Sequence, residues 1–231
     1  MPIISPDSGY LTVINLFATD MPDKQDRLLG AMREIVDAAA YPGWISSTVH
    51  SGVQELGTAN FIQWRSGEDL EARYAGEEFR HRTLPLFIEL TTWMKLLQTQ
   101  VAFTQRHSSL GDTTDISPDR NDYTVIEVFG VAPEDQNDLV AALGQEQAWL
   151  LETPGYRSHS VLYGNRAQGF DGPFVVTYSQ WADKESYDTF RSLPEDEQPG
   201  DRQKTQARLD SLSTSSEWNS YRVVHTRSAG Q

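Results

Sequence analysis

The residues of this sequence with the clearest chemical potential lie in one β-rich run, Asn60-Phe61-Ile62-Gln63-Trp64. Residues two apart along a strand share a face, so Asn60, Ile62 and Trp64 project together, whereas Phe61 and Gln63 point the other way. An asparagine amide and an indole N–H are neutral donors that stabilise negative charge developing on a bound oxygen atom. Asn60 and Trp64 are therefore our candidate catalytic residues, lining one cavity between a sheet and its helices.

A similar run, Thr177-Tyr178-Ser179-Gln180-Trp181, occurs in the second half of the chain. It keeps the tryptophan, but Thr177 replaces the asparagine with a shorter group that has one donor. We include Thr177 and Trp181 as candidate substrate-binding residues. Both tryptophans end apolar strands, so an equally consistent interpretation is that they anchor the core.

Charged candidates follow Trp64 in a helix-rich segment, Phe79 to Thr83. Arg80 offers a guanidinium that can hold a substrate oxyanion, and the neighbouring His81 is a second candidate substrate-binding residue. The alternative is that both side chains are solvated on a helix surface. His50 and His159 lie in strands, and their alternation leaves open whether they face a cavity or solvent.

An internal repeat indicates which elements position these residues. Thr12 to Phe17 corresponds to Thr124 to Phe129, and each run is suited to a buried strand. The sharpest shared signature is Tyr41-Pro42-Gly43-Trp44 with Thr153-Pro154-Gly155-Tyr156, where proline ends a helix and glycine permits the turn into a strand. The chain therefore contains two related halves.

Each half is predicted to follow the order β-α-β-β-α-β. Before the Pro-Gly turn, apolar residues form helical stripes: Leu28, Leu29, Met32, Ile35, Val36 and Ala39, then Leu139, Val140, Leu143, Trp149 and Leu150. The paired strands after the turn are expected at 45–51 with 59–64, and at 158–163 with 174–181. A polar helix follows each Gln-Trp pair, and the halves end in strands at 101–106 and 221–226.

These elements predict an α+β protein of two fused ferredoxin-like units that form an intramolecular dimeric α/β barrel. The expected domains are residues 1–108 and 123–231, joined by a linker at 109–122 that is rich in Ser, Gly, Asp, Thr and Pro. One such unit would leave a face of its sheet apolar and exposed, and pairing two units in one chain covers both faces.

Composition narrows the function classes. The chain has 231 residues, 38% of them hydrophobic, with 19 basic and 33 acidic residues and a net charge of -14. That charge repels a phosphate backbone, so we expect no nucleic acid partner. The lack of cysteine excludes a thiolate metal site or a cysteine nucleophile. No apolar run is long enough to span a bilayer and no leader is evident, so we expect a cytoplasmic protein without membrane contact.

Over almost its whole length, the sequence resembles the antibiotic biosynthesis monooxygenase family. The run Asn60 to Trp64 is similar to the Asn-Tyr-x-Gln-Trp strand of that family's anthrone oxygenases. The resemblance implies a cofactor-independent monooxygenase that oxidises an aromatic polyketide-like phenol or anthrone with molecular oxygen. A family tyrosine beyond the tryptophan is matched by Tyr187, a further candidate substrate-binding residue, but by Leu70 in the first half.

Two alternatives stay open. Because neither half has the full set of family residues, the barrel could bind an aromatic metabolite without catalysis. The family also includes haem-degrading enzymes, for which Asn15, Trp64 and His81 as iron ligand would be the counterparts. In the main interpretation neither metal, haem nor flavin is needed, the partner is a small aromatic substrate, and the chain is a monomeric pseudo-dimer or a homodimer.

Overall fold

The computed structural model describes residues 1–230; Gln231, the last residue of the predicted second domain, lies outside the described residues. Eight long strands form its centre, four from each half of the chain. They are β2 (Leu11–Ala18), β3 (Trp44–Gly52), β4 (Gly57–Trp64), β5 (Trp93–Arg106), β7 (Tyr123–Val131), β8 (Tyr156–Gln168), β9 (Phe174–Trp181) and β10 (Ser213–Ser228).

The eight strands close into one antiparallel barrel in the order β10-β3-β4-β2-β5-β8-β9-β7. Two strands join the halves: β5 pairs with β2 and β8, and β10 pairs with β7 and β3. Closure leaves none of these strands with a free edge. The α+β class and a barrel within one chain are thus confirmed, while independent ferredoxin-like domains stay a prediction.

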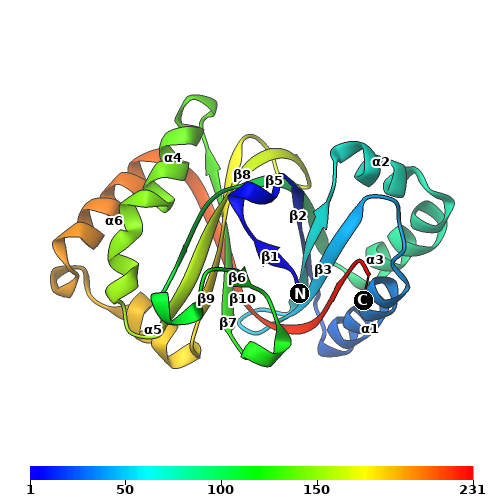
Figure 1. The fold of residues 1–231 in the computed structure, drawn as a ribbon, viewed down its shortest axis with the longest axis horizontal. Helices are drawn as coiled ribbons and strands as arrows, with labels where there is room; N and C mark the ends of the chain where they lie inside the picture. The colour runs from blue at the N-terminus through cyan, green and yellow to red at the C-terminus, as the bar shows by residue number, and fades with distance from the viewer. Residues whose placement is uncertain (231) are drawn as a thin grey trace.

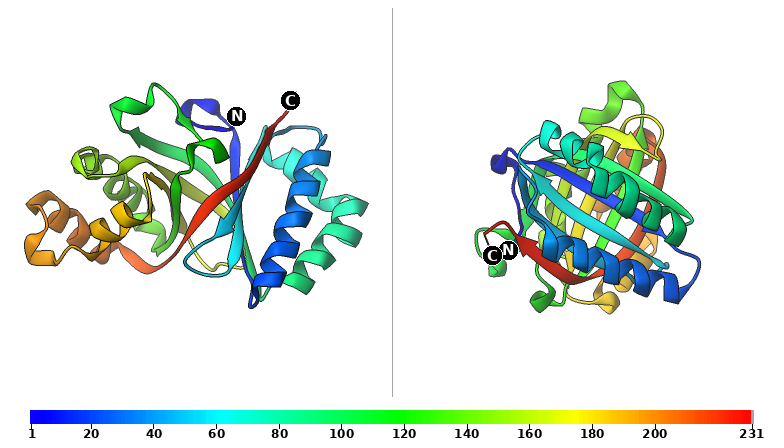
Figure 2. Two further views of the ribbon diagram at one scale, coloured as in Figure 1. Left: turned by 90° about the horizontal axis from the view of Figure 1, so that it is seen from below. Right: turned by 90° about the vertical axis from the view of Figure 1, so that its right-hand side faces the viewer.

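The two joining strands are longer than predicted. They span 14 and 16 residues rather than the short segments at 101–106 and 221–226. Each must bond to a strand of its own half and to a strand of the other half, and the two partners lie at different heights along the barrel. In Figure 2 β10 crosses the molecule from one half to the other.

Helices cover the outside of the barrel on two opposite sides, as Figure 1 shows. The N-terminal half contributes α1 (Pro22–Ala38), α2 (Gly67–Ala75) and α3 (Leu84–Leu90), and the C-terminal half contributes α4 (Gln136–Leu143), α5 (Lys184–Ser192) and α6 (Gly200–Leu212). A π-helical turn at Phe79–Thr83 precedes α3, and a 3-10 helix at Gln145–Glu152 follows α4. None of the helices within residues 1–230 is both long and apolar enough to cross a membrane.

Three predicted helices are divided in the structure. The stripe from Leu139 to Leu150 is broken at Gly144, which packs so closely that an added Cβ would lie 3.0 Å from the Phe103 ring. The segment after each Gln-Trp pair forms two α-helices rather than one. The Pro-Gly turns hold as predicted, because Gly43 and Gly155 both have left-handed backbones, with φ of 76° and 77°.

Alternation along the strands sorts side chains into two layers. The inward faces of the strands other than β3 contribute apolar side chains to a cluster inside the barrel, among them Ile14, Leu16, Phe61, Ile126, Val128 and Tyr178. The other face packs against the helices; Phe17 and Val49 do so beneath α1 and α3. Asn15 and Asn60 belong to this outward face and lie under helices rather than inside the barrel.

The first residues and the linker form a small ribbon at the barrel. Strand β1 (Ile3–Ile4) pairs with β6 (Thr114–Asp115), and the buried Ile4 and Ile116 join the interior cluster. The segment predicted only as a polar linker at 109–122 therefore also contributes Ile116 to the core. The repeated glutamines hold this ribbon: Gln63 Nε2 donates to Ile3 O at 2.9 Å, and Gln180 Nε2 donates to Asp115 O at 3.0 Å.

Candidate functional site

In the N-terminal half a cavity of about 70 Å³ lies between the outer face of β2 and β4 and the helices. Asn60 and Trp64 both line it, as does Asn15, which is directly opposite Asn60 in the β2–β4 pairing. Much of the remaining lining is apolar and comes from α1 and the residue after it, from α2 and from α3: Met32, Ile35, Val36, Ala39, Leu70 and Phe87.

Four buried polar atoms at this cavity lack a hydrogen bond of good geometry to any of residues 1–230. They are Asn15 Oδ1, Asn60 Oδ1, Trp64 Nε1 and the Tyr74 hydroxyl. Asn15, Asn60 and Trp64 are only 7%, 8% and 3% exposed. An unsatisfied buried polar group costs about 1–3 kcal/mol, so four at one place call for a ligand or water that pairs with them.

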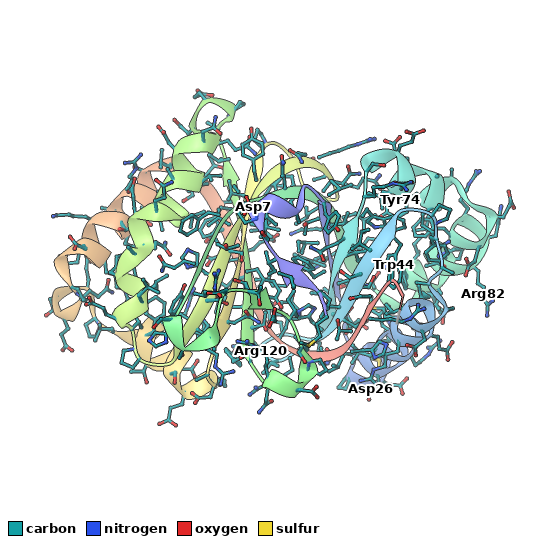
Figure 3. All side chains as sticks on the ribbon, in the orientation of Figure 1. Asp7, Asp26, Trp44, Tyr74, Arg82 and Arg120 are labelled. Atoms are coloured by element: carbon teal, nitrogen blue, oxygen red, sulfur yellow. The ribbon has the colours of Figure 1, made fainter. Side chains whose placement is uncertain are left out.

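An aromatic and cationic cluster covers the cavity. The Arg73 guanidinium lies 4.0 Å from the centre of the Tyr41 ring, and the Tyr74 and Phe79 rings are 4.6 Å apart. Arg73 also pairs with Glu78 at 3.2 Å, although its own side chain is only 8% exposed. Burial raises the pKa of Tyr41 and of Tyr74, with Asn15 partly offsetting the second, so both hydroxyls are neutral donors. Figure 3 shows Tyr74 and Trp44 in this half.

The structure does not bring Arg80 and His81 to this cavity. Both are exposed on the π-helical turn, and His81 pairs with Glu77 on the surface at 3.2 Å with 68% of its side chain accessible. Their neighbour Arg82 lies at the outer edge of the molecule in Figure 3. Arg73 is the cation that lines the cavity instead. His81 is likewise not positioned to hold an iron above Asn15 and Trp64.

The equivalent cavity of the C-terminal half is larger, about 430 Å³. It lies between the outer face of β7 and β9 and the helical segments of that half, and Thr177, Trp181 and Tyr187 all line it. Glu127 occupies the place of Asn15, because it pairs opposite Thr177 as Asn15 pairs opposite Asn60. The three candidates of this half are therefore brought together by the fold.

Charge distinguishes this second cavity. Burial raises the pKa of Glu127, and the Arg191 guanidinium lowers it in part. Burial also raises the pKa of Tyr187 to about 12, so its hydroxyl is neutral and accepts from Arg191 Nη1 at 3.3 Å. The Trp181 indole donates to Ser179 Oγ at 3.1 Å, unlike the unpartnered indole of Trp64.

The two strand histidines face different layers. His50 points into the barrel, where its Nε2 lies 2.8 Å from the Tyr178 hydroxyl of the other half. His159 lines the C-terminal cavity, with Nδ1 at 2.9 Å from the Tyr156 hydroxyl and Nε2 at 3.0 Å from Leu143 O. Burial lowers the pKa of each to about 4, so both imidazoles are neutral at pH 7.

Several lining residues were not found by sequence reasoning. Glu127 could have been predicted, because it aligns with Asn15 in the repeated first strand of the two halves. Tyr41 belongs to the repeated Pro-Gly motif. Arg73, by contrast, is one of several arginines in a polar helix, and only the helix orientation separates it from Arg80. Across residues 1–230 there is no cluster of three His, Cys, Asp or Glu side chains that could hold a metal ion.

Comparison with known proteins includes a close match over the full length. The chain is 52% identical to a crystal structure described as an anthrone oxidase-like protein, with a TM-score of 0.96 over 100% of this chain and 98% of that one. No family model and no curated protein matches the sequence.

Two distant structures share the fold alone. A candidate monooxygenase of Lactobacillus acidophilus NCFM is 11% identical, with a TM-score of 0.58 over 96% of this chain and 98% of that one. A major regulator of staphylococcal pathogenesis is 10% identical, with a TM-score of 0.54 over 93% and 99%. The full-length match has a much higher sequence identity, 52%, than these two structures. The chain therefore belongs to the family of the anthrone oxidase-like protein.

Proposed function

We propose that this protein is a cofactor-independent oxygenase of the antibiotic biosynthesis monooxygenase type, which oxidises an anthrone or a related polycyclic phenol in its N-terminal cavity. The observation that carries the proposal is the set of four buried, unpartnered polar atoms around one apolar space: the amide oxygens of Asn15 and Asn60, which accept, and the Trp64 indole N–H and the Tyr74 hydroxyl, which donate. The 52% identity to an anthrone oxidase-like protein supports the substrate class.

The reaction balances with molecular oxygen as the only co-substrate. The methylene carbon of an anthrone becomes a carbonyl, one oxygen atom enters the product, and the other leaves as water with the two hydrogens. The ionised substrate passes electrons to oxygen, and charge builds up on the substrate oxygen and on the peroxide. The Asn60 amide and the Trp64 indole are the donors that would stabilise this charge in a site shielded from water.

Substrate ionisation needs no carboxylate or imidazole in this cavity. None of the described residues that line it is Asp, Glu or His. Anthrones and polycyclic phenols are acidic enough to ionise with little help, and the Arg73 guanidinium would favour the anion. In this mechanism the substrate supplies the electrons, and the protein supplies hydrogen-bond donors and a positive charge.

Access requires movement of the covering cluster, because about 70 Å³ is less than a tricyclic substrate occupies. Arg73, Tyr41 and Phe79 hold one another by ring and cation contacts at 4.0 and 5.5 Å rather than by main-chain bonds. Side-chain rotation can open such a cluster without unfolding a helix. The π-helical turn beside it is a type of irregularity that often occurs at functional sites.

Oxygen uptake with anthrone tests the proposal, with heat-inactivated protein as the control for spontaneous oxidation. We expect acceleration by the native protein and a loss of about 100-fold in Asn60→Ala, because one donor to a developing oxyanion contributes on this scale. Thr177→Ala changes the equivalent position of the other half and is the matched control. Loss in Thr177→Ala with full activity in Asn60→Ala would contradict the proposed location.

The second candidate is a barrel that binds an aromatic metabolite without turnover. It is favoured by the division of family residues between the halves, with Asn60 beside Leu70 in one and Thr177 beside Tyr187 in the other. Anthrone binding without accelerated oxygen uptake by the native protein would support it. In either case the eight strands close within one chain, which supports a monomeric pseudo-dimer over an obligate homodimer.

A further inference from the structure

The C-terminal cavity contains a cation that lacks a carboxylate partner. Arg202 extends from α6 into the cavity wall, where its guanidinium lies 4.2 Å from the centre of the Phe190 ring and 5.9 Å from that of Trp149. Its helix neighbours Lys204 and Arg208 pair with carboxylates, but no described carboxylate lies within 4.0 Å of Arg202. In a chain of net charge -14, an arginine left in this way offers a site for an external anion.

The second cation of the cavity, Arg191, also has no carboxylate of residues 1–230 within 4.0 Å, but it is engaged by other groups. Its charge lowers the pKa of Glu127 against the effect of burial, and its guanidinium donates to the Tyr187 hydroxyl and lies 4.3 Å from the centre of the Trp218 ring. Asp210 is eight residues beyond Arg202 on α6, about 12 Å along the helix axis at 1.5 Å per residue. Asp210 is also bonded by Gln206 Nε2 at 2.8 Å. The charge of Arg202 is therefore the one available to a ligand.

Aromatic side chains form the wall around Arg202. The Trp149 and Phe190 rings stack at 6.1 Å with an angle of 27°, and the Trp181 and Phe190 rings lie 4.8 Å apart. The Trp149 Nε1 atom is buried and has no hydrogen-bond partner among residues 1–230. That atom has almost no accessible surface, so it is the ring faces and the Arg202 guanidinium that border the cavity, whose volume of about 430 Å³ is within the range of small-molecule sites.

We propose that the C-terminal cavity is a separate binding site for a planar aromatic carboxylate. The carboxylate binds the Arg202 guanidinium, and the ring system lies against Trp149, Phe190 and Trp181. The inference does not depend on oxygenase chemistry in the other half, because it concerns binding at residues on the opposite side of the barrel.

Isothermal titration calorimetry with 2-naphthoate tests the site, with the uncharged 2-naphthamide as the matched ligand. We expect saturable binding of the carboxylate to the native chain and binding of the amide at least tenfold weaker. Arg202→Met keeps most of the aliphatic stem and should weaken naphthoate binding at least tenfold, while leaving the amide unchanged. Arg202→Lys should retain more affinity than Arg202→Met, since it keeps the charge.

Arg208→Met is the control on the same helix, because Arg208 pairs with Glu146 and does not line the cavity. It should bind naphthoate as the native chain does. Thermal unfolding of each variant verifies that the fold is retained. The proposal is overturned if the native chain does not bind naphthoate, if naphthamide binds equally well, or if a folded Arg202→Met keeps native affinity.

Discussion

In the N-terminal half the cavity between barrel and helices measures about 70 Å³, whereas in the C-terminal half it measures about 430 Å³. The first presents neutral amides from Asn15 and Asn60, and the second presents Glu127 and Thr177 at the same paired strand positions. One duplicated framework therefore contains a small apolar cavity with unpaired polar atoms and a larger, charged one. The difference teaches that the barrel fixes where a site lies, while a few substitutions decide its chemistry.

Helix continuity accounts for much of the size difference. In the N-terminal half, α1 runs unbroken for 17 residues and supplies Met32, Ile35 and Val36 to the cavity wall. In the C-terminal half, α4 ends after eight residues, and the 3-10 helix beyond Gly144 contributes Gln147 and Trp149 instead. Aliphatic side chains of α1 fill much of the first cavity. The more polar 3-10 segment that follows α4 leaves the second cavity larger.

The largest expected effect separates the two tryptophans. Trp64→Phe and Trp181→Phe both remove an indole N–H from the same strand position, but only the Trp64 indole is free to donate to a ligand. We expect oxygen uptake with anthrone to fall about 100-fold in Trp64→Phe and to change less than about threefold in Trp181→Phe. Similar losses in both variants, measured beside thermal unfolding, would break the proposed distinction between the halves.

Sequence reasoning succeeded where the signals are local. Strand alternation placed Asn60 and Trp64 on one face, and the Pro-Gly motifs located both turns, because each depends on residues a few positions apart. The roles of Gln63 and Gln180 were not predictable, since their partners Ile3 and Asp115 are distant in sequence. Such ties arise only when the ribbon packs at the barrel.

The second helix of each half was the weakest region for prediction. In the N-terminal half its residues are polar on most sides and only Leu70 of α2 is buried, so periodicity gives little orientation. The π-helical turn then shifts the helical phase between Arg73 and the exposed pair Arg80 and His81. A sequence pattern identifies arginines near the site, but the backbone decides which of them reaches the cavity.

A glycine pair gives the next largest effect and tests the role of helix continuity. An added Cβ at Gly144 would lie 3.0 Å from the Phe103 ring and 3.1 Å from Val140 O, whereas at Gly30 in α1 nothing lies within 4 Å. We expect Gly144→Ala to destabilise the chain by about 1–3 kcal/mol through overpacking, and Gly30→Ala to stabilise it by about 0.5–1 kcal/mol. Urea unfolding measures both, and a Gly144→Ala chain as stable as Gly30→Ala would contradict the close packing at the helix break.

The smallest expected effect concerns the charge that distinguishes the paired positions. Burial raises the pKa of Glu127 in the folded chain, so the folded state favours the protonated carboxyl more than the unfolded state does. The stability it contributes is present below the unfolded pKa and is lost as pH rises through the folded pKa. Glu127→Gln replaces the carboxyl group with an amide, as Asn15 has at the paired position. The free energy of unfolding of this variant should therefore rise relative to that of the native chain between about pH 4 and pH 7. We expect a rise of less than about 1 kcal/mol, because Arg191 offsets part of the effect of burial. Urea midpoints at the two pH values test this. Glu217→Gln is the control, because Glu217 on β10 is a carboxylate that pairs with Lys95 on β5. If Glu127→Gln changes the free energy of unfolding equally at both pH values, the ionised carboxylate is as stable in this cavity as in water. The two cavities would then differ in volume rather than in charge.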